Sequence, residues 1–95
     1  MEANRLWMLL NDLAGQLGVE VRLEALEDGE EFRVRGGLCR LGQSLVAFVD
    51  RRHSPAGRAR QLGLALLGLE WEGVYVRPAV REFLEELRAR EQDKE

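Results

Sequence analysis

The sequence is short of the two residue types that build most metal and disulfide sites. Its 95 residues include one cysteine, Cys39, and one histidine, His53. A lone cysteine excludes a disulfide within the chain, and with one histidine it cannot form a cysteine-based zinc site. We therefore expect no metal, no bound cofactor and no assembled catalytic site, which favours a non-enzymatic role.

Lysine is almost absent as well. Lys94 is the single lysine beside 13 arginines, and the formal net charge is −3. Nucleic acid is not an expected partner, because nucleic-acid-binding surfaces collect a basic surplus on one face. The preference for arginine fits a GC-rich bacterial genome. It is also compatible with a thermophilic source, since arginine–glutamate networks matter more at high temperature.

The chain also lacks a long apolar run. Its longest nearly uncharged segment, residues 61–69, is far shorter than the ~20 residues of a membrane-spanning helix. The first five residues include Glu2 and Arg5 and do not resemble a secretory signal. We expect a cytoplasmic protein that does not associate with membranes.

Three segments have the periodicity of amphipathic helices. The first carries a leucine stripe with helical spacing, formed by Leu6, Leu9, Leu10, Leu13 and Leu17. Asn4 is its expected N-cap and Gly18 its expected stop. The second helix is predicted to begin at Ser54-Pro55 and to run to about Leu69. The third is predicted to follow Pro78.

Between the first two helices the apolar period changes to two. Alternation predicts strands at 19–24 and 31–35, joined through an Asp-Gly turn into a hairpin. Residues 38–41 resume extended structure after a glycine pair. The unbroken apolar run within 44–50 predicts a central strand that is buried on both faces. Residues 74–76 are expected to form a short strand or an extended link.

These elements predict one α+β domain over residues 1–90, with a frayed tail at 91–95. The expected order is α-β-β-β-β-α-(β)-α. We expect a three- or four-stranded, mostly antiparallel sheet with the helices packed on one face.

The first candidate site lies where the strand 44–50 meets the second helix. Arg51, Arg52 and His53 occupy this junction, and helix N-termini attract anions. A phosphate or carboxylate site is therefore one interpretation. The other is a solvated loop with Asp50 near the helix cap.

Cys39 and Arg40 are further candidates for this ligand site. A neighbouring positive charge favours a reactive thiolate, but a nucleophilic cysteine also needs a base. His53 can serve only if strand 38–41 pairs antiparallel with strand 44–50 and its glycine end lies near the helix start. A small thiol within the core is the alternative interpretation of Cys39.

Three aromatic residues, Trp7, Trp71 and Tyr75, are candidates for a protein contact. Aromatic side chains are enriched among the anchors of protein interfaces. Exposure of these rings would favour a binding surface, whereas burial would make them part of the core.

A wider pattern resembles the minimal core of the small bacterial zinc peptidases that cleave phage repressors. The pattern comprises a helix ending in Leu17-Gly18-Val19, a strand closing on Val49–Arg52, a Ser-Pro helix start and the run Arg58–Leu69. In that family a helix carries the motif HExxH. The matching stretch here, Ala65–Leu69, lacks both histidines and the glutamate. The resemblance implies a non-catalytic relative that binds no zinc.

Two functions remain open from the sequence. The first is a non-enzymatic protein-interaction or regulatory module that forms a homodimer, because the chain lacks a catalytic set and carries more apolar surface than 95 residues easily hide. Its partner would be a second copy or another protein. The alternative is a small-anion or small-ligand binding protein with its site at Asp50–His53, extended by Cys39 and Arg40.

Overall fold

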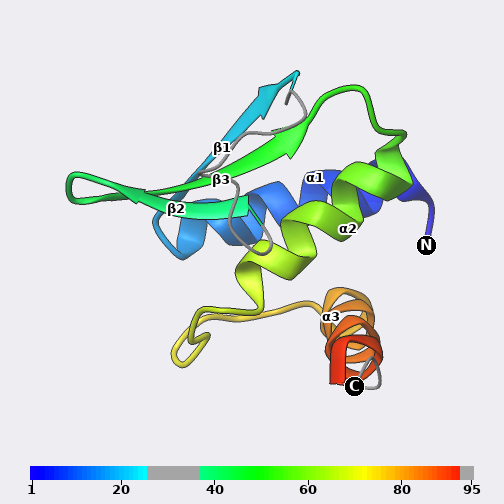
Figure 1. Ribbon diagram of the computed structural model, residues 1–95. Coiled ribbons are helices and arrows are strands. Elements are labelled where there is room, and N and C mark those ends of the chain that lie inside the picture. The colour runs from blue at the N-terminus through cyan, green and yellow to red at the C-terminus, as the bar shows by residue number, and fades with distance from the viewer. Residues whose placement is uncertain (26–36, 93–95) are drawn as a thin grey trace.

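The computed structural model describes residues 1–25 and 37–92. Its elements are α1 (Ala3–Gln16), β1 (Val19–Glu24), β2 (Leu38–Leu41), β3 (Ser44–Asp50), α2 (Pro55–Leu66) and α3 (Pro78–Gln92). Helices α1 and α2 cover one face of the sheet, and α3 lies beyond them, away from the strands (Figure 1). The predicted α+β class is confirmed.

The described strands form a mixed sheet in the order β1-β3-β2. β3 is central, as its apolar run predicts. β2 pairs antiparallel with β3 through the turn at Gly42, whose φ is 62°. β1 instead runs parallel to β3, so the sheet is not mostly antiparallel. The predicted strand 31–35, and with it the hairpin to 19–24, lies outside the described residues.

The register separates the two faces of the sheet. Val19 pairs with Leu45 and Val21 with Ala47, so these positions share the face covered by the helices. Val46 points to the opposite face and is nevertheless only 1% exposed. The central strand is thus buried on both faces, as predicted.

The helix ends follow from local hydrogen bonds. Ser54 caps α2, because its Oγ accepts a hydrogen bond from the Gly57 N–H at 3.2 Å. α1 begins at Ala3, one residue before the predicted N-cap Asn4, and its cap is Glu2, whose Oε1 accepts from the Arg5 N–H. Gly18 follows α1 with a φ of 78°, which only glycine adopts freely.

α2 ends at Leu66, three residues before the predicted end at Leu69. The indole Nε1 of Trp71 donates a hydrogen bond to the Leu66 carbonyl at 3.1 Å, and the Leu69 N–H also donates to it. These two donors satisfy the Leu66 carbonyl, which in a longer helix would accept from the next turn. α3 extends to Gln92, so residues 91 and 92 are helical where the sequence predicted fraying. Residues 74–76 form an extended link rather than a strand.

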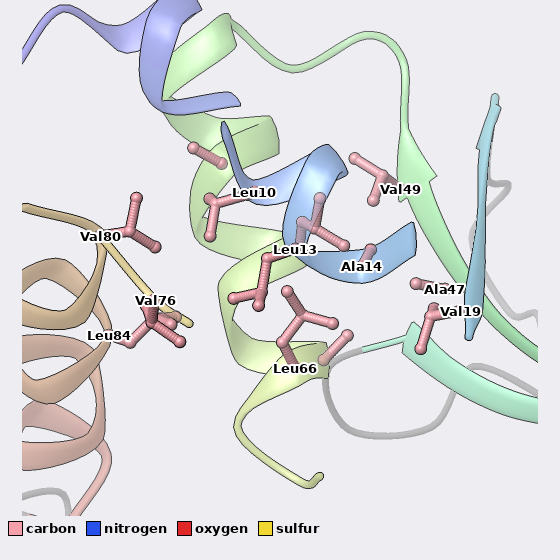
Figure 2. Close-up of a cluster of buried hydrophobic side chains, with 13 residues drawn as sticks. Leu10, Leu13, Ala14, Val19, Ala47, Val49, Leu66, Val76, Val80 and Leu84 are labelled. Atoms are coloured by element: carbon pink, nitrogen blue, oxygen red, sulfur yellow. The ribbon is translucent and has the colours of Figure 1, made fainter. Parts of the chain in front are cut away.

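The core lies between the sheet and the helices (Figure 2). Leu10, Leu62 and Leu66 from α1 and α2 are completely buried, and Ala47 and Val49 meet them from β3. Val80 and Leu84 of α3 close the core on the far side. No helix in the described part has the length and apolar character needed to cross a membrane.

Candidate functional site

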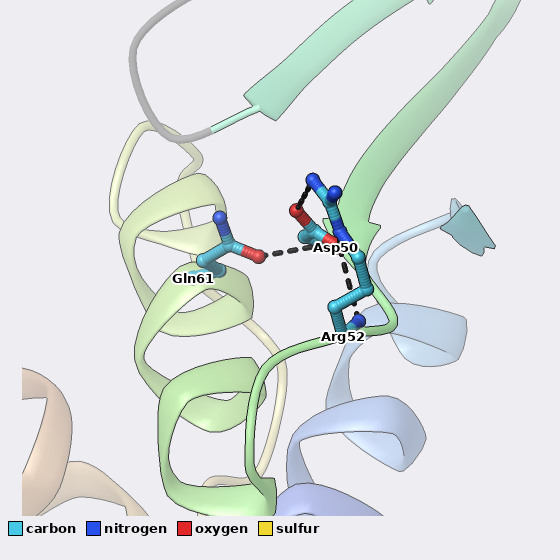
Figure 3. A network of polar contacts seen from close by, with 3 residues as sticks. All are labelled: Asp50, Arg52 and Gln61. Atoms are coloured by element: carbon cyan, nitrogen blue, oxygen red, sulfur yellow. Dashed lines mark hydrogen bonds and ion pairs between the residues drawn. The ribbon is translucent and has the colours of Figure 1, made fainter. Parts of the chain in front are cut away.

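The strand-to-helix junction is organised around the carboxylate of Asp50, the last residue of β3. The Arg52 guanidinium donates to both carboxylate oxygens, with Nε 2.9 Å from Oδ1 and Nη2 2.7 Å from Oδ2 (Figure 3). The Arg52 N–H also donates to Oδ1 at 3.0 Å. The Gln61 side chain from α2 accepts the Asp50 N–H at 2.8 Å. This network ties the end of β3 to α2.

The network sets the charge state of Asp50. Hydrogen bonds from the Arg52 side chain and backbone favour the carboxylate and hold the pKa of Asp50 well below its usual range, against the opposing effect of desolvation. Asp50 is buried, whereas the Arg52 side chain is 61% exposed. The Arg52 side chain therefore lies on the solvent side of the carboxylate. An anion that binds Arg52 would have to compete with Asp50.

The other predicted junction residues do not converge on a common point. The Arg51 N–H donates to the Glu24 carbonyl at the end of β1, at 3.1 Å, and the Arg51 side chain is exposed. His53 is exposed too, and its carbonyl accepts a hydrogen bond from Arg58 at 3.1 Å. The three residues lie together as neighbours in sequence, but Arg52 faces Asp50.

Cys39 and Arg40 lie on β2, away from the junction. Cys39 is opposite Val46 and Arg40 is opposite Leu45, so their side chains point to opposite faces of the sheet. β2 does run antiparallel to β3, which is the direction that a Cys39–His53 pair requires. Val46 nevertheless precedes Asp50 by four residues, about 13 Å at ~3.3 Å per residue. The register therefore keeps the half-buried thiol apart from His53.

The segment that the peptidase resemblance aligns with the metal motif is only partly helical. Ala65 and Leu66 are buried in the last turn of α2, and Leu67–Leu69 lie beyond the end of the helix. Among residues 1–25 and 37–92, no three His, Cys, Asp or Glu side chains lie close enough to hold a metal ion. The non-catalytic relationship implied by the resemblance stays a prediction.

A different surface, between α1 and α3, contains two hollows. The first, here called the Tyr75 hollow, has a volume of about 170 Å³. The second half of α1 and the chain leading into α3 line it, through Leu9, Asp12, Gln16, Tyr75 and Arg77. Its floor is apolar, and charged groups stand at its edge.

The second hollow, here called the Phe83 hollow, also lies between α1 and α3 and has a volume of about 240 Å³. The start of α1 and the first turns of α3 line it, through Met1, Leu6, Ala79, Glu82, Phe83 and Glu86. We call the two hollows together the α1–α3 seam.

Two exposed apolar side chains, Tyr75 and Met1, line the hollows of the α1–α3 seam, and a third, Met8, lies on α1. Tyr75 is 73% exposed, and Met1 and Met8 are each 62% exposed. Met8 lies one helical turn before Asp12 on α1. The other two large apolar side chains exposed in the described part, Leu23 and Leu41, belong to the sheet. The leucine stripe of the sequence does not point to the two methionines, which lie outside it.

The two tryptophans have a structural role instead. Both are half-buried against the core. The Arg58 guanidinium lies 5.4 Å from the centre of the Trp7 ring, and that of Arg88 lies 5.5 Å from the centre of the Trp71 ring. Of the three aromatic candidates, Tyr75 is the one that presents its ring to solvent.

A larger hollow of about 490 Å³ lies where Leu38 of β2 faces Leu64 and Leu67 near the end of α2 and Gln92 of α3.

Comparisons of the chain with protein-family models, with curated proteins and with solved structures give no match.

Proposed function

We propose that the protein is a non-enzymatic interaction module that binds a protein partner through the α1–α3 seam. One observation carries the proposal: Tyr75 and Met1, two of the five large apolar side chains exposed in the described part, line the hollows of this seam. Solvent-exposed apolar groups gathered beside hollows are typical of interaction sites.

The energetics favour a protein contact at this place. Covering apolar surface contributes about 25 cal/mol per Å², and an aromatic ring that enters a pocket is a common interface anchor. Tyr75 directly precedes Val76, which is buried, so the core already holds the backbone next to the ring. Little backbone freedom would therefore be lost when the ring is covered.

The alternative, an anion site at Asp50–His53, has less support from the geometry. An anion-binding arginine should direct free donors outward, but Arg52 gives two side-chain donors to Asp50. Arg51 and His53 are both exposed to solvent. Binding of phosphate with a Kd below 1 mM that is lost in Arg51→Ala would reverse this preference.

The proposal is tested by placing a photoreactive benzophenone amino acid at position 75 and irradiating the native host. The matched control carries the same group at Leu41, an exposed apolar residue of β2. We expect protein adducts from position 75 and few from position 41, with peptide mass spectrometry identifying the partner. Equal labelling from both positions, or none from position 75, would refute the seam as the contact surface.

A further inference from the structure

We infer that α3 is a detachable helix, which separates transiently from α1 and α2 as one unit while those helices and the sheet stay folded. Such an opening removes the α1–α3 seam, because α3 lines part of each hollow. The inference goes beyond the proposed function, and its consequence for binding rests on that function. It follows from the position of α3, from its packing and from the segment that attaches it.

Most of the buried core cluster belongs to the sheet, α1 and α2. Leu10 and Leu62 of the two helices are completely buried, and Val49 of β3 belongs to the same cluster. α3 lies on the far side of these helices, away from the strands (Figure 1). It contributes Val80 and Leu84 to the cluster from that side (Figure 2). The detachment of α3 therefore leaves the larger part of the core in place.

α3 is held by a short row of apolar side chains. Val80, Leu84 and Leu87 are its buried residues, and their spacing places them on one face of the helix. The row packs closely on α2 at Gly63, where a Cβ would lie 2.8 Å from Leu87. On the side of α1, hollows of about 170 and 240 Å³ border the same helix. An element that is closely packed on one neighbour only opens at a lower free energy than the core.

Two polar contacts of α3 with the rest of the chain lie at the surface. Glu91 forms a 3.6 Å ion pair with Arg60 of α2, and both side chains reach solvent. The exposed Arg88 guanidinium lies 5.5 Å from the centre of the Trp71 ring. Solvent-exposed contacts of both kinds are weak. They therefore add little to the attachment that the apolar row provides.

The segment between α2 and α3 supplies a pivot. Residues 67–77 contain neither helix nor strand. Trp71 fixes the first half of the segment to α2, because its indole Nε1 donates to the Leu66 carbonyl at 3.1 Å. Gly73 follows in an exposed turn with a φ of 79°, and a Cβ there would meet no atom within 4 Å. Backbone rotation at this glycine would move α3 without disturbing Trp71 or α2.

Docking of α3 controls whether the seam exists. The Tyr75 hollow depends on the chain leading into α3, and the Phe83 hollow depends on the first turns of α3. A partner that uses these hollows binds the docked form alone, so its binding suppresses the opening. Conversely, the apparent affinity of the seam falls in proportion to the docked fraction. α3 thus acts as a switch for the binding surface.

Native-state hydrogen exchange of the full-length chain tests the opening, and it needs no partner. We expect the amides of residues 82–88 in α3 to share one opening equilibrium, after correction for their intrinsic exchange rates. Their exchange should be at least about ten-fold faster than that of residues 46–49 in β3. Equal protection of α3 and β3, or rates that rise steadily towards the end of α3, would overturn an opening as one unit.

Two matched substitutions separate this opening from global unfolding. Val80→Ala in α3 and Val49→Ala in β3 remove the same atoms from buried positions on different sides of the core (Figure 2). Val80→Ala should speed exchange roughly ten-fold in both α3 and β3, because it weakens the docked form alone. Val49→Ala should speed exchange by a similar factor in β3 and leave α3 within about two-fold, since Val49 stays buried while α3 is detached.

An α3 that responds equally to the two substitutions would overturn the detachable helix, and so would an α3 that responds to neither. Either result leaves the interaction module standing, because the module requires only the docked form. Absence of adducts from position 75 would instead refute the interaction module and leave the opening of α3 standing.

Discussion

Helix α1 meets its two helical neighbours in different ways. Against α2 it forms a closed interface, where Leu10 packs with Leu62 and Leu66 and all three are completely buried. Against α3 it leaves the two hollows of the α1–α3 seam. One helix thus supplies both the core of the fold and the proposed binding surface.

The difference originates in the way α3 is attached. A Cβ added at Gly63 of α2 would lie 2.8 Å from Leu87 and 3.0 Å from Phe83. α3 therefore packs directly against the α2 backbone at this glycine, and Val80 of α3 belongs to the same core cluster as Leu10 and Leu13 of α1. Close approach to one helix leaves space along the other. The contacts that stabilise the fold therefore lie at the α1–α2 interface, whereas the accessible hollows lie at the α1–α3 seam.

The strongest way to break the closed interface is Leu66→Asp. This change removes a completely buried side chain and replaces it with a carboxylate that has no partner, so we expect a loss of about 4 kcal/mol or more in the free energy of unfolding. Thermal and urea unfolding followed by circular dichroism would measure it. The control is Met8→Asp at an exposed position of α1, expected within about 0.5 kcal/mol of wild type. An unaltered melting temperature for Leu66→Asp would contradict the core assignment.

A smaller effect is expected when α3 is pushed away from α2. Gly63→Val places a branched side chain against Leu87 and Phe83, and overpacking of this kind costs about 1–3 kcal/mol. Hydrogen exchange should increase in α3 more than in α1. Gly15→Val is the matched control, because a Cβ at Gly15 meets no atom within 4 Å. Equal destabilisation by the two substitutions would show that helix propensity, rather than contact with α3, sets the cost.

The smallest expected effect concerns Asp50, which joins β3 to α2 on the closed side. Its pKa is lower in the folded chain than the ~3.9 of an unfolded aspartate. Its contribution to stability is therefore fully present above about pH 4 and decreases as the pH falls further. Asp50→Asn should be less stable than wild type at pH 7, and the difference should shrink towards pH 2. Urea midpoints across this range measure it, with Glu20→Gln as the exposed control. A difference independent of pH would refute the charged contact with Arg52.

Several elements of the fold were predictable from local patterns. The leucine period of residues 6–17 predicts α1, Ser54-Pro55 predicts the start of α2, and the apolar run predicts β3 as the central strand. Each of these features depends on neighbours within a few positions in the sequence. The predicted end of α2 lies three residues too late. The Leu66 carbonyl accepts a hydrogen bond from the Trp71 side chain, and apolar periodicity carries no information about this contact.

Features that depend on distant contacts were not predictable in the same way. Alternation identifies β1 as a strand but does not specify its partner, so its parallel pairing with β3 required the structure. The junction residues Arg51 and Arg52 look equivalent in the sequence, and only Arg52 turns back onto Asp50. Tyr75 was a candidate from residue type alone, whereas its position on the α1–α3 seam depends on how α3 packs at Gly63.

The parallel pairing of β1 has a consequence for synthesis of the chain. Val19 pairs with Leu45, which is translated 26 residues later. At about 5–20 residues per second, β1 waits roughly one to five seconds for its central neighbour. During that interval Glu20, Arg22 and Glu24 place charges at alternate positions along the strand, and charged strands resist pairing with other chains. The alternation that makes one face of β1 polar would thus also protect the nascent chain from aggregation.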